Sequence, residues 1–163
     1  MDFKHATLVF PITPKIIVLG EKKVRWGAGF LNAPGGRIEP EETPEQAAIR
    51  ELKEELELTA STDDLEKVAM LYMYIDDSPK FAIHTYLAHK WSGEPRESDE
   101  LIPEIHPLHA IPYDRMWPAD QAWMTLVFDG ERICKRIFLE SDGDPQKPNH
   151  FARMEDCVSP YAP

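Results

Sequence analysis

The sequence predicts a single α+β domain in which strands surround two helices. Runs of β-branched and apolar residues of strand length alternate with turns rich in Gly, Pro, Asn and Asp, and one segment near position 44 has the capping pattern and periodicity of an amphipathic helix. The chain has 163 residues, of which 42% are hydrophobic and 29% charged, as is typical of a globular protein with its own core. We expect the domain to span residues 1–158 and residues 159–163 to be a flexible tail.

Short apolar runs between turn signals predict the strands. Residues 4–10 and 15–20 are predicted to pair as a hairpin, because proline-containing turn residues separate them. Residues 67–75 and 80–90 are predicted to be strands on either side of a turn at 76–79. The remaining candidates are a short run at 30–32, a strand or irregular segment at 105–111, and a last hairpin of 131–139 with 150–155.

Two helices are predicted between these strands. The first begins at Pro44, because Thr43 supplies an N-cap hydroxyl, proline fits the first helical position, and Gln46 completes a capping box. The second is opened by Pro118 and runs to about Phe128.

The first helix separates an apolar face from an acidic one. At about 100° per residue, three apolar side chains lie within roughly 60° and three carboxylates within roughly 100° on another side. Neighbouring carboxylates repel unless a cation lies between them, and Arg50, one turn before Glu54, is placed to orient one of them. The apolar residues are Ile49, Leu52 and Leu56, and the acidic ones are Glu51, Glu54 and Glu55. A solvated acidic helix is the alternative to a cation site.

The spacing around this helix is Gly36, five residues, Glu42, seven residues, and then Arg50-Glu51-Leu52-Lys53-Glu54-Glu55, which resembles the Nudix box. The resemblance implies the Nudix fold, an α+β arrangement with a mixed β-sheet sandwiched between helices. It also implies a hydrolase in which water attacks a phosphorus atom of a nucleoside diphosphate linked to another group, helped by metal-binding carboxylates. Glu42 is expected to orient Arg50 or the loop rather than to bind metal.

The same resemblance implies a metal and the residues that hold it. Carboxylate oxygens without His or Cys suit Mg²⁺, with Mn²⁺ as the other candidate, and Mg²⁺ typically shares its shell with substrate phosphates. Glu55 is the first expected ligand and Glu51 the second. Glu100, far from the box, is expected to complete the metal shell or act as a base, and a solvated surface residue is the alternative for it. The metal set is Gly36, Glu51, Glu54, Glu55 and Glu100, and the catalytic set is Arg50, Glu51, Glu54, Glu55 and Glu100.

Further segments are similar to the branch of the family that hydrolyses oxidised purine nucleoside triphosphates. They extend the resemblance from about residue 5 to 140 and comprise 20–29, 32–36, 97–100 and 111–120. They imply that a base stacks on Trp117 and is read by the carboxyl group of Asp120 and the amide of Asn32. Core packing is the alternative for Trp117, and a turn role is the alternative for Asn32.

The resemblance also assigns the rest of the substrate pocket. Met73 and Phe81 are expected to line its apolar side, although a methionine on a strand more often belongs to the core. Lys22 and Lys23 are expected to meet the polyphosphate or to form the solvated end of a hairpin. The substrate-binding set is Asn32, Met73, Phe81, Trp117, Asp120 and Lys23.

This chain departs from the family pattern at three positions. Glu57 replaces a glycine near the end of the first helix, where a left-handed residue costs a non-glycine roughly 1 kcal/mol or more. Pro34 replaces a bulkier, flexible residue in the loop before the box. Ala119 stands where the oxidised-purine enzymes have a second acid beside Asp120, so the preference for an oxidised base is left open.

Composition excludes several classes of function. A net charge of −11 argues against extended nucleic-acid binding, which depends on Lys and Arg contacts to phosphates. The N-terminus lacks a signal-peptide pattern and no segment approaches 18 apolar residues, so we expect a cytoplasmic protein without a membrane partner. Cys134 and Cys157 are therefore expected to be reduced thiols. The six histidines lack the context of a zinc site, and the sequence does not define an oligomeric state.

Three functions fit these observations. The first is a metal-dependent pyrophosphohydrolase of purine nucleoside triphosphates, oxidised or not, with a small nucleotide as its substrate. The second is removal of pyrophosphate from RNA 5′ ends, which the net charge disfavours. The third is a nucleotide-sensing module without catalysis, which the full set of mutually repelling acids disfavours.

Overall fold

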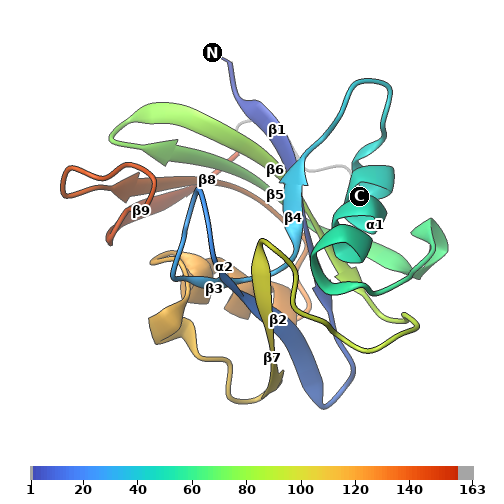
Figure 1. Ribbon diagram of the computed structural model, residues 1–163. Helices are drawn as coiled ribbons and strands as arrows, with labels where there is room; N and C mark the ends of the chain where they lie inside the picture. The colour runs from blue at the N-terminus through green and yellow to red at the C-terminus, as the bar shows by residue number, and fades with distance from the viewer. Residues whose placement is uncertain (1, 158–163) are drawn as a thin grey trace.

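The computed structural model describes residues 2–157 and places nine strands in two sheets (Figure 1). The strands are β1 (Lys4–Pro11), β2 (Ile16–Lys22), β3 (Leu31–Asn32), β4 (Gly35–Arg37), β5 (Leu65–Ile75), β6 (Ser78–Ala88), β7 (Leu101–Pro107), β8 (Ile133–Glu140) and β9 (His150–Asp156). The helices are α1 (Pro44–Leu56) and α2 (Asp120–Phe128), with short 3₁₀ turns at Thr62–Asp64 and Tyr113–Arg115.

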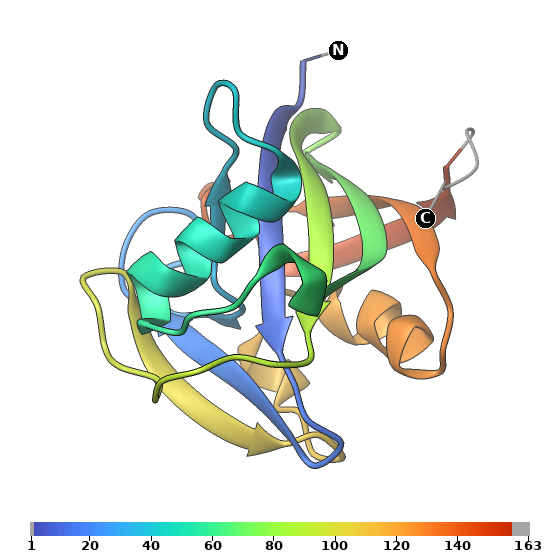
Figure 2. The ribbon, with the colours of Figure 1, turned by 90° about the vertical axis from the view of Figure 1, so that its right-hand side faces the viewer.

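The larger sheet is mixed. It has six strands in the order β4-β1-β6-β5-β8-β9, and a smaller sheet has the order β3-β2-β7. In the larger sheet β1 is parallel to β6 and β5 is parallel to β8, whereas the other neighbours are antiparallel. Figure 2 shows α1 and α2 on different sides of this sheet.

The two helices cover opposite faces of the larger sheet. Val9 and Phe10 are consecutive residues of β1, so their side chains point to opposite faces. Val9 is buried with Leu52 of α1, and Phe10 is buried with Trp123 of α2. The predicted α+β fold, with a mixed sheet between helices, is therefore confirmed.

The sequence correctly predicts the start of α1, and its end, which the sequence left open, lies at Leu56. The Thr43 side chain accepts a hydrogen bond from Gln46 N at 3.1 Å, and Gln46 Oε1 accepts one from Thr43 N at 2.9 Å. The helix begins at Pro44 and ends before Glu57, which takes the left-handed conformation with φ 57° and donates its N–H to Lys53 O at 3.0 Å. Glu57 thus adopts the backbone conformation of the glycine it replaces.

The predicted hairpin of residues 4–10 and 15–20 is wrong, although both segments are strands. The strands β1 and β2 belong to different sheets, and within the described residues an isolated bridge between Ile12 and Ile17 joins their ends. The edges of β1 are already paired with β4 and β6. Because no edge of β1 is left, β2 turns away and pairs with β3 and β7.

Other boundaries differ by a few residues. The helix α2 begins at Asp120 rather than Pro118. The strand predicted at 105–111 lies earlier in the chain, as β7 at residues 101–107. The hairpin of β5 and β6 and that of β8 and β9 are confirmed. The predicted tail at 159–163 and the domain boundary at 158 lie outside the described residues. No helix within residues 2–157 is both long enough and apolar enough to cross a membrane.

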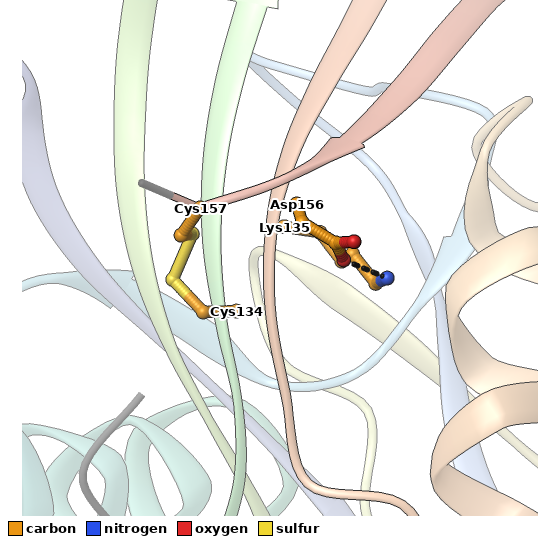
Figure 3. Close-up of a disulfide and its surroundings, with 4 residues drawn as sticks. All are labelled: Cys134, Lys135, Asp156 and Cys157. Carbon is orange, nitrogen blue, oxygen red and sulfur yellow. Dashed lines mark hydrogen bonds and ion pairs between the residues drawn. A yellow bond between two sulfur atoms is a disulfide. The ribbon is translucent and has the colours of Figure 1, made fainter. Parts of the chain in front are cut away.

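The prediction of reduced cysteines is wrong, because Cys134 and Cys157 form a disulfide (Figure 3). The antiparallel register of β8 and β9 pairs Lys135 with Asp156, so the next pair along the hairpin is Cys134 and Cys157. Their Cα atoms are 5.4 Å apart, within the range of a disulfide. Figure 3 shows the disulfide on one side of the hairpin and the ion pair of Lys135 with Asp156 on the other, as alternating side chains require.

Candidate active site

A cavity of about 580 Å³ lies between the acidic face of α1 and the start of α2. At one end it is lined by charged residues, among them Arg50, Glu51 and Glu54 of α1. At the other end it is lined by apolar side chains of β5, β6 and β8 and by Trp117. Two chemically different ends in one cavity suit a ligand with a charged part and an apolar part.

Arg50 organises the charged end. Its Nε and Nη2 donate to the two carboxylate oxygens of Glu42 at 2.7 and 2.9 Å. Its Nη1 donates to Glu51 at 2.7 Å and to Glu54 at 3.3 Å. The hydrogen bonds from Arg50 hold the pKa of Glu42 below its usual value, so Glu42 stays ionised and fixes the guanidinium group. The expectation that Glu42 orients Arg50 agrees with this geometry.

Glu51 and Glu55 are buried under strand β4 at Gly35 and Gly36. The Gly35 N–H points to Glu55 Oε1 at 3.4 Å, and a Cβ atom at Gly36 would lie 2.3 Å from Glu51 Oε1. Any larger residue at position 36 would therefore displace the Glu51 carboxylate. Burial, reinforced by the hydrogen bond and charge of Glu51, raises the pKa of Glu55 to about 8, against the opposing effect of Lys22.

This pair of buried acids fits a hard divalent cation. Without a cation, Glu55, whose pKa is raised to about 8, carries a proton at neutral pH, and a cation in place of that proton would neutralise the charge of the pair. The neighbouring donors are also oxygens, which suits Mg²⁺ or Mn²⁺ rather than a softer metal. Glu54 is turned toward Arg50 with its side chain 58% exposed. Within residues 2–157, no three of the His, Cys, Asp and Glu side chains are already arranged as a metal site. Glu54 would therefore have to turn toward Glu51 and Glu55 to bind a cation together with them.

Glu100 lies at the mouth of the cavity, although it is far from the box in sequence. Lys22 Nζ is 3.1 Å and Arg25 Nη1 is 3.4 Å from its carboxylate oxygens, and all three residues line the cavity. The structure thus brings Glu100 to the charged end, as the resemblance implies. Lys23, by contrast, is not among the lining residues and pairs with Glu97 at 3.1 Å.

Trp117 forms a wall of the apolar end. Its side chain is 7% exposed and lines the cavity, and the Phe30 ring is packed against it at a centroid distance of 5.4 Å. Met73 and Phe81 face each other across β5 and β6 and line the same end. Asn32 also lines the cavity, and its Oδ1 accepts a hydrogen bond from Ala33 N at 2.8 Å.

Asp120 is the buried acid of this end. Its two oxygens accept hydrogen bonds from Trp117 N at 3.2 Å and from Trp123 Nε1 at 3.0 Å. Burial raises the pKa of Asp120 to about 7, although the two hydrogen bonds oppose the shift. Ala119 beside it is buried and lines the cavity, so a methyl group stands where the resemblance implies a second acid.

Several lining residues lie outside the sequence-based site. Trp26 contacts the Phe81 ring edge-on at 5.3 Å, and Arg25 extends into solvent with its side chain 75% exposed. The floor of the apolar end is formed by residues of three strands, namely Leu71, Ile83, Ile137 and Leu139. A strand pattern alone predicts which residues share a face, but only the pairing of β5 with β8 brings Ile137 opposite Met73.

Comparisons with known proteins agree with this geometry. A family model described as the NUDIX domain matches residues 3–127. The chain is 38% identical over 131 residues to an oxidized purine nucleoside triphosphate hydrolase of Danio rerio, covering 80% of this chain and 83% of the relative. It is 37% identical over 129 residues to the protein of the same description in Mus musculus, covering 78% and 81%.

A shorter match and a structural match complete the comparison. An 8-oxo-dGTP diphosphatase of Escherichia coli K12 is 42% identical over 95 residues, covering 58% of this chain and 70% of the relative. The crystal structure of a mutator MutT protein from Bacillus halodurans superposes with a TM-score of 0.72 at 20% identity, covering 93% of this chain and 97% of that one. At that identity the match supports the fold alone.

Proposed function

Because the chain belongs to the Nudix family, we propose that it is a metal-dependent pyrophosphohydrolase. It converts a purine nucleoside or deoxynucleoside triphosphate, with an oxidised or an ordinary base, to the monophosphate and pyrophosphate. The family and the long matches to its relatives make the chain a hydrolase of pyrophosphate bonds in nucleoside triphosphates. The metal and the base are the proposed parts. Removal of damaged nucleotides from the pool is the role that the relatives' names suggest.

One observation carries the proposal. A single cavity has the acids and Arg50 at one end, and Trp117 with the buried Asp120 at the other. Phosphates with their cation are therefore expected at the α1 end, and the base at the α2 end. Lys22 and Arg25 lie at the charged end and are placed to bind phosphate oxygens once Glu100 releases them.

The residues at the charged end would hold a divalent cation. Glu51 and Glu55 would bind it, and Gly36 leaves room for the Glu51 carboxylate. Glu54 and Glu100, which line the same cavity, would complete the shell. Bound Mg²⁺ or Mn²⁺ supplies charge neutralisation and a water of lowered pKa. Arg50 keeps the Glu51 carboxylate in place through its 2.7 Å hydrogen bond while the charge on the phosphates changes.

The apolar end favours a guanine-type base. Trp117 offers a flat ring for stacking, which is worth about 1–3 kcal/mol per base. The carboxyl group of Asp120, with its pKa near 7, is able to accept hydrogen bonds from ring N–H and amino groups when ionised and to donate one when protonated. Because Ala119 supplies no second acid, we propose weaker discrimination between dGTP and 8-oxo-dGTP than a two-acid site achieves.

A substrate panel tests this function. Purified protein with Mg²⁺ is expected to release pyrophosphate from dGTP and 8-oxo-dGTP faster than from dCTP, and EDTA is expected to abolish the release. No pyrophosphate from any triphosphate, with nucleotide binding retained, would identify a sensing module instead. Release from a triphosphorylated RNA oligomer alone would identify an RNA 5′-end pyrophosphohydrolase.

We also propose a cytoplasmic location, because the nucleoside triphosphate substrate is abundant there. Disulfides are rare in that compartment, so the pair Cys134–Cys157 makes this location testable. Alkylation of free thiols in freshly lysed cells, followed by mass spectrometry, should report whether the two thiols are paired. A protein recovered only from a secreted or periplasmic fraction would contradict the location.

A further inference from the structure

The connection between β8 and β9, residues 141–149, touches the loop between β2 and β3, residues 23–30. The Gly27 N–H donates a hydrogen bond to the backbone carbonyl of Gln146 at 2.8 Å. Lys147 Nζ lies over the Phe30 ring, 5.2 Å from its centroid. It also lies directly over Gly29, where a Cβ atom would be 2.7 Å away. Two segments more than a hundred positions apart are therefore joined at the rim of the cavity.

The opposite side of the same loop forms a wall of the apolar end of the main cavity, which we call the base pocket. Gly27 is packed so tightly on the Trp117 indole that a Cβ atom would lie 2.8 Å from its Nε1, and its φ of 77° also favours glycine. Phe30 packs against Trp117, and Trp26 packs against Phe81. Loop 23–30 is thus held between Trp117 on one side and Lys147 on the other.

A second cavity of about 520 Å³ lies between the connection and residues 113–118, and Phe30 is the residue of the loop in its lining. Phe30 therefore borders open space as well as Trp117. The hydrogen bond to Gln146 and the cation over the Phe30 ring are restraints that the connection adds to the packing of the loop on Trp117. A surface loop opens locally at low free energy where few such restraints hold it.

We propose that the connection 141–149 is a latch for the base pocket, in which Lys147 and the Gln146 carbonyl are positioning groups that hold loop 23–30 against Trp117. The latch lies beyond residues 3–127, the part of the chain that matches the family model. It acts on substrate affinity rather than on the chemical step, since it touches the base end of the cavity and not the acids of α1. This inference rests on the proposed function of the cavity as a nucleotide site.

Lys147→Met tests the latch, because it removes the cation and keeps the length of an exposed side chain. We expect the KM for the purine triphosphate to rise about three- to tenfold, with kcat changed less than about twofold. We also expect faster hydrogen exchange at the Gly27 amide in the nucleotide-free protein, measured by NMR. Lys147→Arg, which keeps the cation over Phe30, should restore both values.

Lys90→Met is the matched control, since Lys90 is an exposed lysine after β6 and its loss changes the net charge equally. It should leave KM and Gly27 exchange at the wild-type values. Unchanged Gly27 exchange in Lys147→Met would overturn the latch, as would faster exchange with unchanged KM, or an equal effect of Lys90→Met. The exchange measurement needs no substrate and therefore tests the contact between the two segments by itself. A wild-type protein that is inactive on every triphosphate would refute the proposed function without affecting that test.

Discussion

Glu55→Gln removes the charge of the buried carboxyl group and keeps its shape. In the cation-free protein Glu55 has a pKa of about 8, against 4.5 for an ordinary glutamate. The native state therefore holds the proton more tightly than the unfolded state does. As pH rises above 4.5 the unfolded chain releases this proton and the native state does not, so the free energy of unfolding falls until about pH 8.

The size of this effect follows from the shift. One pKa unit corresponds to about 1.4 kcal/mol, so the wild type should lose on the order of 4 kcal/mol between pH 5 and pH 8 through this group. Glutamine resembles the protonated acid and does not titrate, so the variant should lose none of it. Asp120 contributes a loss of the same sign, because its pKa is also raised, but it does so in both proteins and cancels in their difference.

Urea unfolding in EDTA at pH 5, 6, 7 and 8 measures the difference. The free energy of unfolding of the Gln variant should rise relative to that of the wild type, by about 4 kcal/mol between pH 5 and pH 8. Its turnover with saturating Mg²⁺ should fall about 10²-fold or more. Glu54→Gln is the matched control, because it makes the same substitution at an exposed carboxylate of the same helix. Parallel pH curves for wild type and Glu55→Gln would refute the reasoning, and wild-type turnover in the variant would remove Glu55 from the metal site.

Four further variants test the other parts of the molecule. Trp117→Ala should lower kcat/KM by about ten- to a hundredfold through lost stacking, whereas normal kinetics with a collapsed melting temperature would return Trp117 to the core. Ala119→Asp should raise kcat/KM for 8-oxo-dGTP relative to dGTP by several-fold or more. If Asp120→Asn leaves the ranking of dGTP, 8-oxo-dGTP and dCTP unchanged, Asp120 does not read the base. The double variant Cys134→Ser and Cys157→Ser should lose about 3 kcal/mol of stability, as expected for a disulfide that spans 23 positions, and unchanged urea unfolding would show that the thiols are not paired.

The fold could be predicted wherever one segment carried its own signal. The capping box of Thr43 and Gln46 marks the start of α1, and the Asp76-Asp77 turn, with φ of 51° and 59°, matches the positive-φ turns that join tight hairpins. The partner of β2 could not be predicted in this way, because it depends on which sheet edges are free. The predicted last hairpin contains Cys134 and ends two residues before Cys157. Once the register of β8 and β9 is known, the same hairpin places Cys134 opposite Cys157.

The candidate site shows the same contrast. Features set within one element could be predicted from the sequence, and features that depend on several elements could not. The acids of α1 are spaced by the helix itself, so their common face follows from the sequence. At the mouth of the cavity the choice between Lys22 and Lys23 depends instead on the direction of one strand. Lys22 is the last residue of β2 and faces the cavity, and Lys23 therefore faces away, toward Glu97. The sequence offers no apolar alternation at these two polar positions, so only the pairing of β2 with β7 determines which lysine lines the cavity.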